Sequence, residues 1–305
     1  MRKVPTLDYS LNNSDPDLFS EKLFQALKDY GFVVLKNHPV DNDLIKNAYS
    51  LLNDFFIKSN EHKSKFMGET RQTGFIPFGL EHAKDKSPDL YDLKEFWQTS
   101  RVHFEKEKDD KYFPKNVLLD DNNFNDTIHK LYGEFDCLSR ALLGSIGRSL
   151  NIEKGTLEKL VVDGNSILRG IHYPPLDGMT VEGHVRAAAH EDINLITIMP
   201  GASDNGLEIL DHDGNWLPVE ANYDYLIVDT GDMLSRITND MLPATTHRVV
   251  NPKDLSVRRL SLPFFVHPHP DATLKGLDNC GESKYEEITS NDFLQERLKE
   301  IGLKK

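Results

Sequence analysis

The 305-residue sequence contains little cysteine, no long hydrophobic run and no surplus of positive charge. Its two cysteines, Cys137 and Cys280, are too few for a disulfide framework or a thiolate zinc site, and each reads more simply as a small buried residue. No apolar stretch approaches the roughly 18 residues that suggest a membrane-spanning helix. The positively charged start, residues 1–3, is not followed by the apolar segment of a signal peptide. These absences predict a cytoplasmic protein with no membrane partner.

The charge balance argues against nucleic acid as a partner. The sequence has 36 Lys+Arg against 49 Asp+Glu, a formal net charge of −13, and it has no long basic block. Such a surplus of acidic groups repels phosphate backbones and anionic lipid. Hydrophobic residues at 38% and charged residues at 28% are the proportions of a folded protein.

Hydrophobic periodicity divides the chain into a helical first half and a β-rich second half. Apolar residues at helical spacing predict helices near residues 16–30, 41–56 and 124–150, with a short strand at 32–35. From about Ser166 the sequence changes to short β-rich runs separated by turn signals, at residues 167–173, 193–199, 207–210, 216–219, 225–229, 247–250 and 259–266. Many short strands at close spacing predict an antiparallel barrel or jelly roll.

Two of the expected strands, within 193–199 and 260–266, are apolar on both alternating faces, so neither face can be exposed to water. The apolar stripes of the N-terminal helices are the expected cover. Residues 1–305 are therefore expected to form a single integrated domain. It would comprise a mainly helical N-terminal region (1–165), a jelly-roll core (166–270) and a C-terminal region (271–305) with a closing helix at 290–302.

A candidate metal site begins at His190 and Asp192, which are two residues apart at the start of an expected strand. A period of two places both on one face and turns Glu191 the other way. His247, on another expected strand, supplies a third ligand. Two histidines and one carboxylate leave three coordination positions open, which suits a non-haem Fe(II) oxygenase. The alternative is that these are ordinary buried or surface histidines, because His-x-Asp triplets are common.

Arg259 and Ser261 fall on one face of an apolar strand and form a candidate carboxylate site. Burying an unpaired charge costs several kcal/mol or more, so the guanidinium requires a partner. Its forked donors match a carboxylate, and the serine hydroxyl adds a further hydrogen bond. Tyr173, at the end of the run 167–173, is a candidate phenol donor to the same carboxylate. A structural ion pair between Arg259 and an internal acid is the alternative.

These features together resemble the isopenicillin N synthase-like family of Fe(II)/2-oxoglutarate-dependent oxygenases. The motifs that carry the resemblance are His190-x-Asp192, His247, Arg259-x-Ser261 and Tyr173-Pro174-Pro175. The likeness covers nearly the whole chain, through residues 4–8, 30–38, 74–77, 92–96, 231–234, 238–239 and 264–266. Ile171 and Leu176 depart from residues that plant members often carry, and in this respect the chain is more similar to bacterial members.

The resemblance implies a mainly β protein with flanking helices, built on a double-stranded β-helix of the cupin-like jelly-roll type. It implies that His190, Asp192 and His247 hold Fe(II). It also implies that the iron binds 2-oxoglutarate and O2, and that the distal carboxylate of 2-oxoglutarate meets Arg259, Ser261 and Tyr173. The implied activity couples decarboxylation of 2-oxoglutarate to hydroxylation, desaturation or cyclisation of a small-molecule substrate.

Three other functions remain open from the sequence. Isopenicillin N synthase uses the same Arg-x-Ser pair for its peptide substrate, so an oxidase or cyclase independent of 2-oxoglutarate is one of them. A non-catalytic jelly-roll sensor of a small anion is the second. A zinc hydrolase is the third, although no positioned general base stands out.

Substrate contacts are expected from residues 74–78, residues 169–173 and the C-terminal helix. The candidates are Phe75, Arg169 and His172. An ion pair for Arg169 and an outer-face position for His172 are equally compatible with the sequence. His184 and His267 are expected at the surface or behind the metal ligands rather than among them.

Overall fold

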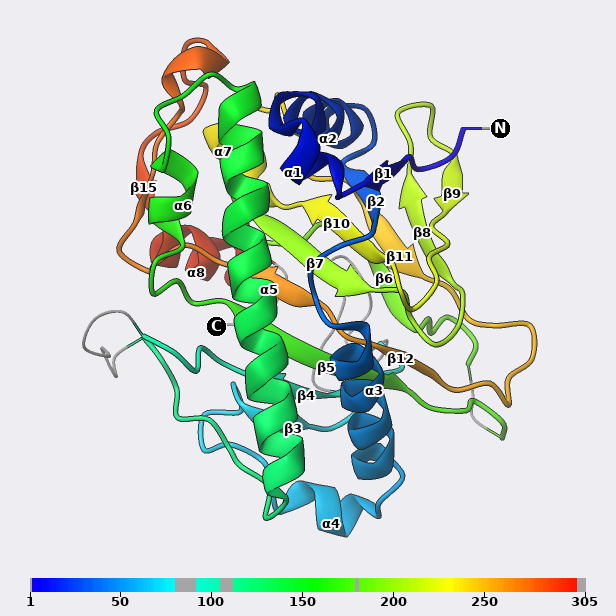
Figure 1. Ribbon diagram of the computed structural model, residues 1–305. Helices are drawn as coiled ribbons and strands as arrows, with labels where there is room; N and C mark the ends of the chain where they lie inside the picture. Colours follow the sequence, from blue (N-terminus) through cyan, green and yellow to red (C-terminus); the bar gives the residue numbers. More distant parts are fainter. Residues whose placement is uncertain (1, 80–91, 105–111, 179–180, 301–305) are drawn as a thin grey trace.

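The computed structural model describes residues 2–79, 92–104, 112–178 and 181–300 (Figure 1). The first half contains β1 (Thr6–Asp8), α1 (Leu11–Ser14), α2 (Pro16–Tyr30), β2 (Phe32–Lys36), α3 (Asn42–Phe56), α4 (Asn60–Ser64), β3 (Gly74–Ile76), β4 (Glu95–Thr99), α5 (Asn122–Ser149) and α6 (Thr156–Leu160). The second half contains β5 (Ile167–Tyr173), β6 (Ala187–His190), β7 (Ile196–Pro200), β8 (Leu207–Leu210), β9 (Trp216–Pro218), β10 (Leu226–Thr230), α7 (Asp232–Ile237), β11 (His247–Val249), β12 (Arg259–Ser261), β13 (Phe264–Val266), β14 (Thr273–Leu274), a 3-10 turn (Asp278–Cys280), β15 (Ile288–Thr289) and α8 (Ser290–Glu300).

The helices α2 and α3 each begin at a capping aspartate, and α2 ends at a glycine. Asp15 caps α2 by accepting a hydrogen bond from the Leu18 amide at 3.1 Å, and Gly31 ends the helix in a left-handed conformation with φ of 64°. Asp41 caps α3 by accepting from the amides of Asp43 and Leu44. Among the helices that the structure describes, none is both long enough and apolar enough to cross a membrane.

Two sheets make up the core, and their strands pair antiparallel except that β1 runs parallel to β2. The large sheet has the order β1-β2-β10-β7-β13-β5-β4-β3, with β12 also paired to β5, and the smaller sheet has the order β6-β11-β8-β9. Side chains from both sheets meet in one buried cluster, which we call the interior; it contains Phe32, Ile171, Tyr173, Met199, Ile227, Ala187, Leu207, Leu217 and Val249. The predicted double-stranded β-helix with flanking helices is confirmed.

The other face of the large sheet packs against helices α2, α3 and α5. Ile196 and Ile198 of β7, Val228 of β10 and Phe264 of β13 belong to the same buried cluster as the apolar stripe of α5. The long helix α5 runs across this face in Figure 1. Strands that are apolar on both faces are therefore covered by the interior on one side and by helices on the other, as the sequence predicted.

Two of the predicted strands, 193–199 and 259–266, differ from the structure. β6 ends at His190 and β7 begins at Ile196 in the other sheet, so residues 191–195 cross between the sheets instead of continuing a strand. The expected strand 259–266 is divided into β12 and β13 around Pro263, which has no amide hydrogen for a strand ladder. The closing helix is α8, Ser290–Glu300, and its last two expected residues, 301 and 302, lie outside the described residues.

Candidate functional site

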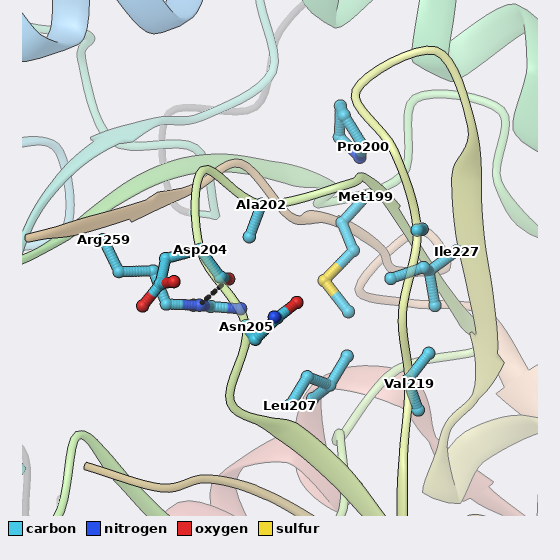
Figure 2. Close-up of a pocket in the computed structure, with 10 residues that line it drawn as sticks. Met199, Pro200, Ala202, Asp204, Asn205, Leu207, Val219, Ile227 and Arg259 are labelled. Atoms are coloured by element: carbon cyan, nitrogen blue, oxygen red, sulfur yellow. Dashed lines mark hydrogen bonds between the residues drawn. The ribbon is translucent and has the colours of Figure 1, made fainter. Parts of the chain in front are cut away.

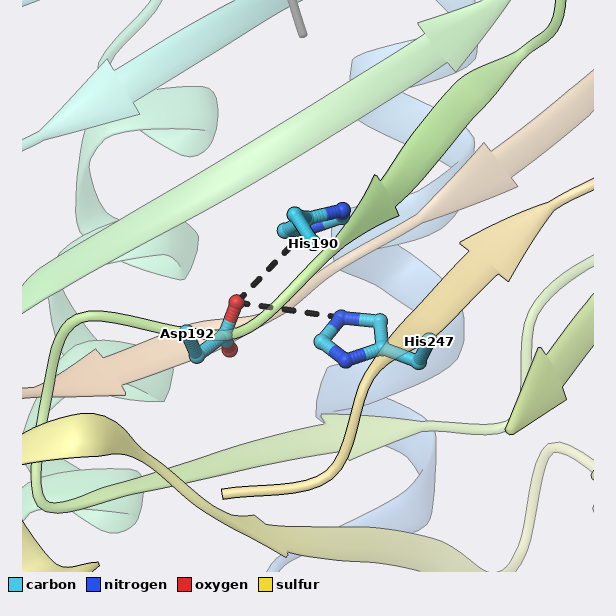
Figure 3. Close-up of side chains that lie close together, drawn as sticks. All are labelled: His190, Asp192 and His247. Carbon is cyan, nitrogen blue, oxygen red and sulfur yellow. Dashed lines mark ion pairs between the residues drawn. The ribbon is translucent and has the colours of Figure 1, made fainter. Parts of the chain in front are cut away.

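His190, Asp192 and His247 converge at one edge of the smaller sheet (Figure 3). His190 ends β6 and lies opposite His247 of β11 in the strand register. One ligand atom from each of the three residues lies within 4.8 Å of the other two. The Nε2 atoms of His190 and His247 are 3.8 Å and 3.7 Å from Asp192 Oδ1. Two nitrogens and one oxygen therefore face a common point, the donor set and spacing that suit a single metal ion.

In both histidines the Nδ1 atom has a hydrogen-bond partner, which leaves the Nε2 atom free to bind a metal. His190 Nδ1 is 2.7 Å from the Ala188 carbonyl oxygen, and His247 Nδ1 is 3.2 Å from that of Thr245. A carbonyl oxygen only accepts, so the proton belongs on Nδ1 and the lone pair on Nε2. Burial, and then the neighbouring His190, lowers the pKa of His247 to about 4. The ring is therefore neutral at pH 7, as metal binding requires.

Asp192 is held by the crossing between the sheets and not by a strand. Its Oδ2 accepts a hydrogen bond from the Thr197 hydroxyl. Its backbone carbonyl accepts from the Asp232 amide at 2.8 Å, and the Met233 amide donates to Asn194 O at 2.9 Å. The free amides at the start of α7 thus fix the crossing. Asp192 and His247 side chains are 7% and 9% exposed, whereas His190 is 42% exposed, so the site opens on the His190 side.

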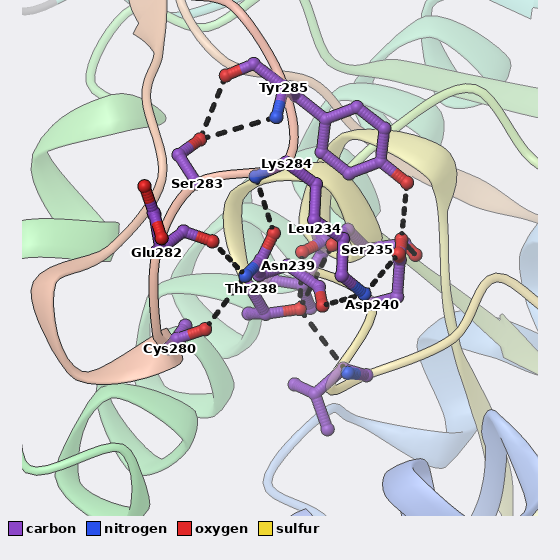
Figure 4. A network of polar contacts seen from close by, with 11 residues as sticks. Leu234, Ser235, Thr238, Asn239, Asp240, Cys280, Glu282, Ser283, Lys284 and Tyr285 are labelled. Carbon is purple, nitrogen blue, oxygen red and sulfur yellow. Dashed lines mark hydrogen bonds and ion pairs between the residues drawn. The ribbon is translucent and has the colours of Figure 1, made fainter.

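A polar network fixes the turn that connects α7 to β11 and His247 (Figure 4). Asn239 and Asp240 both adopt left-handed backbone conformations, with φ of 57° and 64°. The Asn239 side-chain amide donates to the carbonyls of Cys280 and Glu282 at 3.0 and 2.7 Å. Asp240 accepts from Lys284 Nζ at 3.0 Å. The segment between β14 and β15 therefore braces the chain that carries the third candidate ligand.

Arg259, Ser261 and Tyr173 share the interior face of two paired strands. Arg259 lies opposite Tyr173 in the register, and its guanidinium carbon is 5.0 Å from the centre of the Tyr173 ring. Ser261 follows two residues later on the same face, and all three are buried. Arg259 Nε donates to the Asp204 carbonyl at 3.0 Å, while its buried Nη1 has no partner. Within the described part of the chain, no carboxylate forms an ion pair with Arg259, so the structural ion pair is not observed there.

Arg259, whose buried Nη1 has no partner, lines a small pocket between the two sheets (Figure 2). The apolar side chains that line this pocket are Met199, Leu207, Val219 and Ile227. The polar residues Asp204 and Asn205 line it as well. His247 packs edge-to-face against Phe32, which belongs to the same interior cluster as these apolar residues. A buried guanidinium with a free donor at an apolar pocket fits a ligand carboxylate.

Arg169, one of the three substrate candidates, faces the interior. Its guanidinium carbon lies 4.1 Å from the centre of the Phe96 ring and 5.3 Å from that of Phe265. Its Nε donates to Gln98 Oε1 at 3.0 Å. Alternation along β5 places Arg169 on the same face as Ile171 and Tyr173, both members of the interior cluster.

His172 and Phe75, the other two substrate candidates, are not brought to the interior. His172 stacks on Phe56 of α3 with ring centres 5.0 Å apart, and its Nδ1 is 2.8 Å from Glu95 Oε1. Phe75 packs edge-to-face against Phe55. Both contacts lie on the helix-covered face of the large sheet. The physical reason is the period of two, because His172 must point opposite to Tyr173.

Several residues that line the site have no clear signal in the sequence. Asp204 and Asn205 lie in the loop between β7 and β8, where neither spacing nor periodicity indicates which way a side chain points. Phe96 and Gln98 lie on β4, an unpredicted strand. The pleat of β4 places Phe96 and Gln98 on one face, but the five residues of this strand show no alternation of apolar and polar residues in the sequence.

His267 gives the site a testable pH dependence. It is buried, its Nδ1 has no partner, and burial lowers its pKa to about 4 from the ordinary 6.5. The unfolded chain binds this proton more readily, so stability is full above pH 6.5 and falls as pH drops towards 4. When the pH is lowered from 7 to 5, we expect the free energy of unfolding of the apoprotein to fall by about 2 kcal/mol because of His267.

Urea unfolding at the two pH values measures this effect. His267→Gln should reduce the loss of stability between pH 7 and pH 5, whereas His212→Gln, an exposed position in the β8–β9 hairpin, should leave it unchanged. An identical pH dependence in the wild type and His267→Gln would contradict a neutral buried His267.

Comparisons with known proteins agree with this geometry. A family model described as non-haem dioxygenase in morphine synthesis N-terminal matches residues 4–121, and the 2OG-Fe(II) oxygenase superfamily model matches residues 164–268. Proline hydroxylase buaE of Petromyces alliaceus is 30% identical over 323 residues, covering 97% of this chain and 98% of that protein.

Solved structures extend the comparison to the fold. The crystal structure of a protein assigned to the 2OG-Fe(II) oxygenase family from Caulobacter crescentus has a TM-score of 0.87 and 38% identity, covering 97% of this chain and 98% of that one. A full-length Neurospora crassa protein, solved in complex with alpha-KG and thymine, has a TM-score of 0.85 and 23% identity, covering 97% and 96%. The second similarity concerns the fold alone.

Proposed function

This chain belongs to the 2OG-Fe(II) oxygenase superfamily and is an Fe(II)- and 2-oxoglutarate-dependent oxygenase of small molecules, and we propose that His190, Asp192 and His247 hold its iron. The observation that carries this proposal is the convergence of one ligand atom from each residue within 4.8 Å. The family relationship favours this oxygenase over the sensor, the zinc hydrolase and the 2-oxoglutarate-independent oxidase that the sequence left open.

The protein's own contribution is orientation of the ligands and exclusion of water. The Ala188 and Thr245 carbonyls fix the Nδ1 tautomers of His190 and His247, and the Thr197 hydroxyl orients the Asp192 carboxylate. Iron with 2-oxoglutarate and O2 supplies the oxidising chemistry, which yields succinate and CO2 as co-products. The apolar walls of the interior keep bulk water away from the reacting groups.

We assign Arg259, Ser261 and Tyr173 to the distal carboxylate of 2-oxoglutarate. The buried Arg259 Nη1 without a partner supports this assignment, because leaving a charged donor unsatisfied in an apolar wall is costly. The Ser261 hydroxyl lies on the same strand face, and the Tyr173 ring flanks the guanidinium. A carboxylate here would receive charge-assisted hydrogen bonds from Arg259.

We further propose that Arg169 recognises an oxygen acceptor on a compact polar substrate. Its planar cation is placed against Phe96 and Phe265, and Gln98 fixes Nε. Carboxylates and ring carbonyls offer acceptors that match a guanidinium. The similar proteins include one named as a proline hydroxylase, and that name is compatible with a small substrate of this kind.

A metabolite screen tests this function. Compact carboxylates, amino acids and pyrimidines are incubated with enzyme, Fe(II), 2-oxoglutarate and O2, and succinate is measured above the rate without substrate. For an activating compound, Arg169→Met should raise the substrate KM at least about tenfold, the loss expected from one charged hydrogen bond. The 2-oxoglutarate requirement should stay unchanged.

Arg148→Met provides the matched control, because Arg148 lies on α5, where it contacts Ser20 and Asp17. An unchanged substrate KM in Arg169→Met would remove Arg169 from the substrate site. Failure of every compound to stimulate succinate formation, with uncoupled turnover intact, would contradict the proposed substrate class.

A further inference from the structure

A second buried arginine, Arg186, pairs with Asp204 in the wall of the Arg259 pocket. Arg186 immediately precedes β6, and its side chain is completely buried. Its Nη1 is 3.3 Å from Asp204 Oδ2, and its Nη2 donates to the Val257 carbonyl at 2.5 Å. Its guanidinium carbon is 5.8 Å from the centre of the Tyr173 ring, which Arg259 also approaches. Arg186 therefore connects three segments that surround the proposed cosubstrate site.

Asp204 contacts both arginines, but through different groups. Its carboxylate pairs with Arg186, and its backbone carbonyl accepts the hydrogen bond from Arg259 Nε. Asp204 lines the pocket and its side chain is 30% exposed. A carboxylate in the wall of a pocket that binds a carboxylate is unfavourable in two ways. It repels the ligand, and it competes for the same guanidinium.

The charges of the three residues leave one positive charge for a ligand. Arg186 and Arg259 each contribute a cation, since arginine stays protonated in proteins, and Asp204 contributes one anion. The ion pair between Arg186 and Asp204 offsets one cation with the anion. Arg259 then keeps its charge and a free Nη1. This is the charge that one monoanionic carboxylate requires.

We propose that Arg186 is a positioning residue of the cosubstrate site. By holding the Asp204 carboxylate, it keeps that acid from pairing with Arg259 and fixes the carbonyl that orients Arg259 Nε. Arg259 Nη1 is thereby left for the distal carboxylate of 2-oxoglutarate. The inference rests on the proposed role of Arg259, and it adds a residue that does not itself line the pocket but pairs with Asp204, which does.

The experiment compares Arg186→Met, Asp204→Asn, the double variant and Arg186→Lys by steady-state kinetics with varied 2-oxoglutarate, on the full chain with Fe(II). We expect Arg186→Met to raise the 2-oxoglutarate KM about tenfold or more, with kcat at saturating 2-oxoglutarate within about twofold of wild type. Adding Asp204→Asn should restore most of the KM, because the released carboxylate is then neutral. Arg186→Lys, which keeps the charge, should raise the KM less than Arg186→Met.

A purely structural role for Arg186 predicts something different. Loss of packing would lower kcat and stability, and Asp204→Asn would not rescue the KM of Arg186→Met. Equal 2-oxoglutarate KM values for Arg186→Met and the double variant would overturn the proposal. If Arg186→Met does not fold, the comparison of Arg186→Lys with Asp204→Asn tests the proposal. A 2-oxoglutarate KM that rises as much in Asp204→Asn as in Arg186→Lys would also overturn the proposal.

Arg259→Met separates this inference from the proposed function. If the 2-oxoglutarate KM rises in Arg259→Met but stays at the wild-type value in Arg186→Met, only the role of Arg186 fails. If the KM is unchanged in Arg259→Met, 2-oxoglutarate binds elsewhere and the proposed cosubstrate site fails with it.

Discussion

Replacement of Asp192, His190 or His247 by alanine, one at a time, is expected to abolish stoichiometric Fe(II) binding and to lower succinate formation on the order of a thousandfold or more. Each variant removes one of the three ligand atoms that we propose, which leaves two donors for the metal. Asp192 also carries the only negative charge among the three, so its loss removes the charge that balances a divalent cation. Equilibrium dialysis with metal analysis and a succinate assay measure the two quantities.

His212→Ala is the matched control for the metal-binding prediction. His212 is an exposed histidine on the β8–β9 hairpin of the same small sheet. Its replacement tests whether the loss of any imidazole lowers iron binding and turnover. Its Fe(II) stoichiometry and turnover should equal those of the wild type. Retention of one equivalent of iron with normal turnover in any of the three ligand variants would exclude that residue from the metal site.

Arg259→Met is expected to raise the 2-oxoglutarate KM by about 10- to 150-fold while Fe(II) binding is preserved. Hydrogen bonds to charged groups contribute about 1.5–3 kcal/mol, and each 1.4 kcal/mol corresponds to a factor of ten in affinity. Iron binding should persist because the three candidate ligands come from β6, β11 and the crossing, whereas Arg259 belongs to β12. Succinate formation at varied 2-oxoglutarate concentrations measures the KM.

Arg258→Met is the control for the cosubstrate prediction. Arg258 precedes Arg259 in sequence but is exposed, and its Nη1 donates to Asn53 Oδ1 at 2.8 Å. Arg258→Met removes one positive charge, as Arg259→Met does, but it does not change a residue of the pocket. Its 2-oxoglutarate KM should therefore stay close to that of the wild type. Equal KM values for the two variants would show that a general loss of positive charge, and not the buried guanidinium, explains the effect.

Hydrophobic periodicity predicted the long elements because their burial pattern is regular. The helices α2, α3 and α5 and the strand β5 were found within a few residues, since each has a continuous apolar stripe and a recognisable start or stop. The short strands β3, β4 and β6 were not predicted as separate elements. With three to five residues each, they are too short for alternation to be distinguished from loop sequence.

The three candidate metal ligands could be proposed from the sequence, but part of the reasoning was incomplete. The two-residue period of a strand predicted that His190 and Asp192 lie on one face of the same strand. In the structure the strand ends at His190, and the amides of α7 hold the crossing that carries Asp192. A local pattern cannot reveal a constraint imposed by residues about 40 positions later in the chain.

The same period decides between the two positions that the sequence left open for His172. Arg169 and Tyr173 of β5 share one face, so His172 must lie on the other, where it stacks on Phe56. For Phe75 no such test existed, because β3 has only three residues. Arg186 and Asp204 were also invisible from the sequence, since their pairing joins the start of β6 to a loop between two sheets.

The most direct test is a crystal structure of the protein grown without oxygen in the presence of Fe(II) and 2-oxoglutarate, with anomalous diffraction recorded at the iron edge. We predict one iron peak between His190 Nε2, His247 Nε2 and an Asp192 carboxylate oxygen, and the distal carboxylate of 2-oxoglutarate on Arg259. An iron peak away from these three side chains, or 2-oxoglutarate bound with Arg259 paired to a protein carboxylate, would contradict the account.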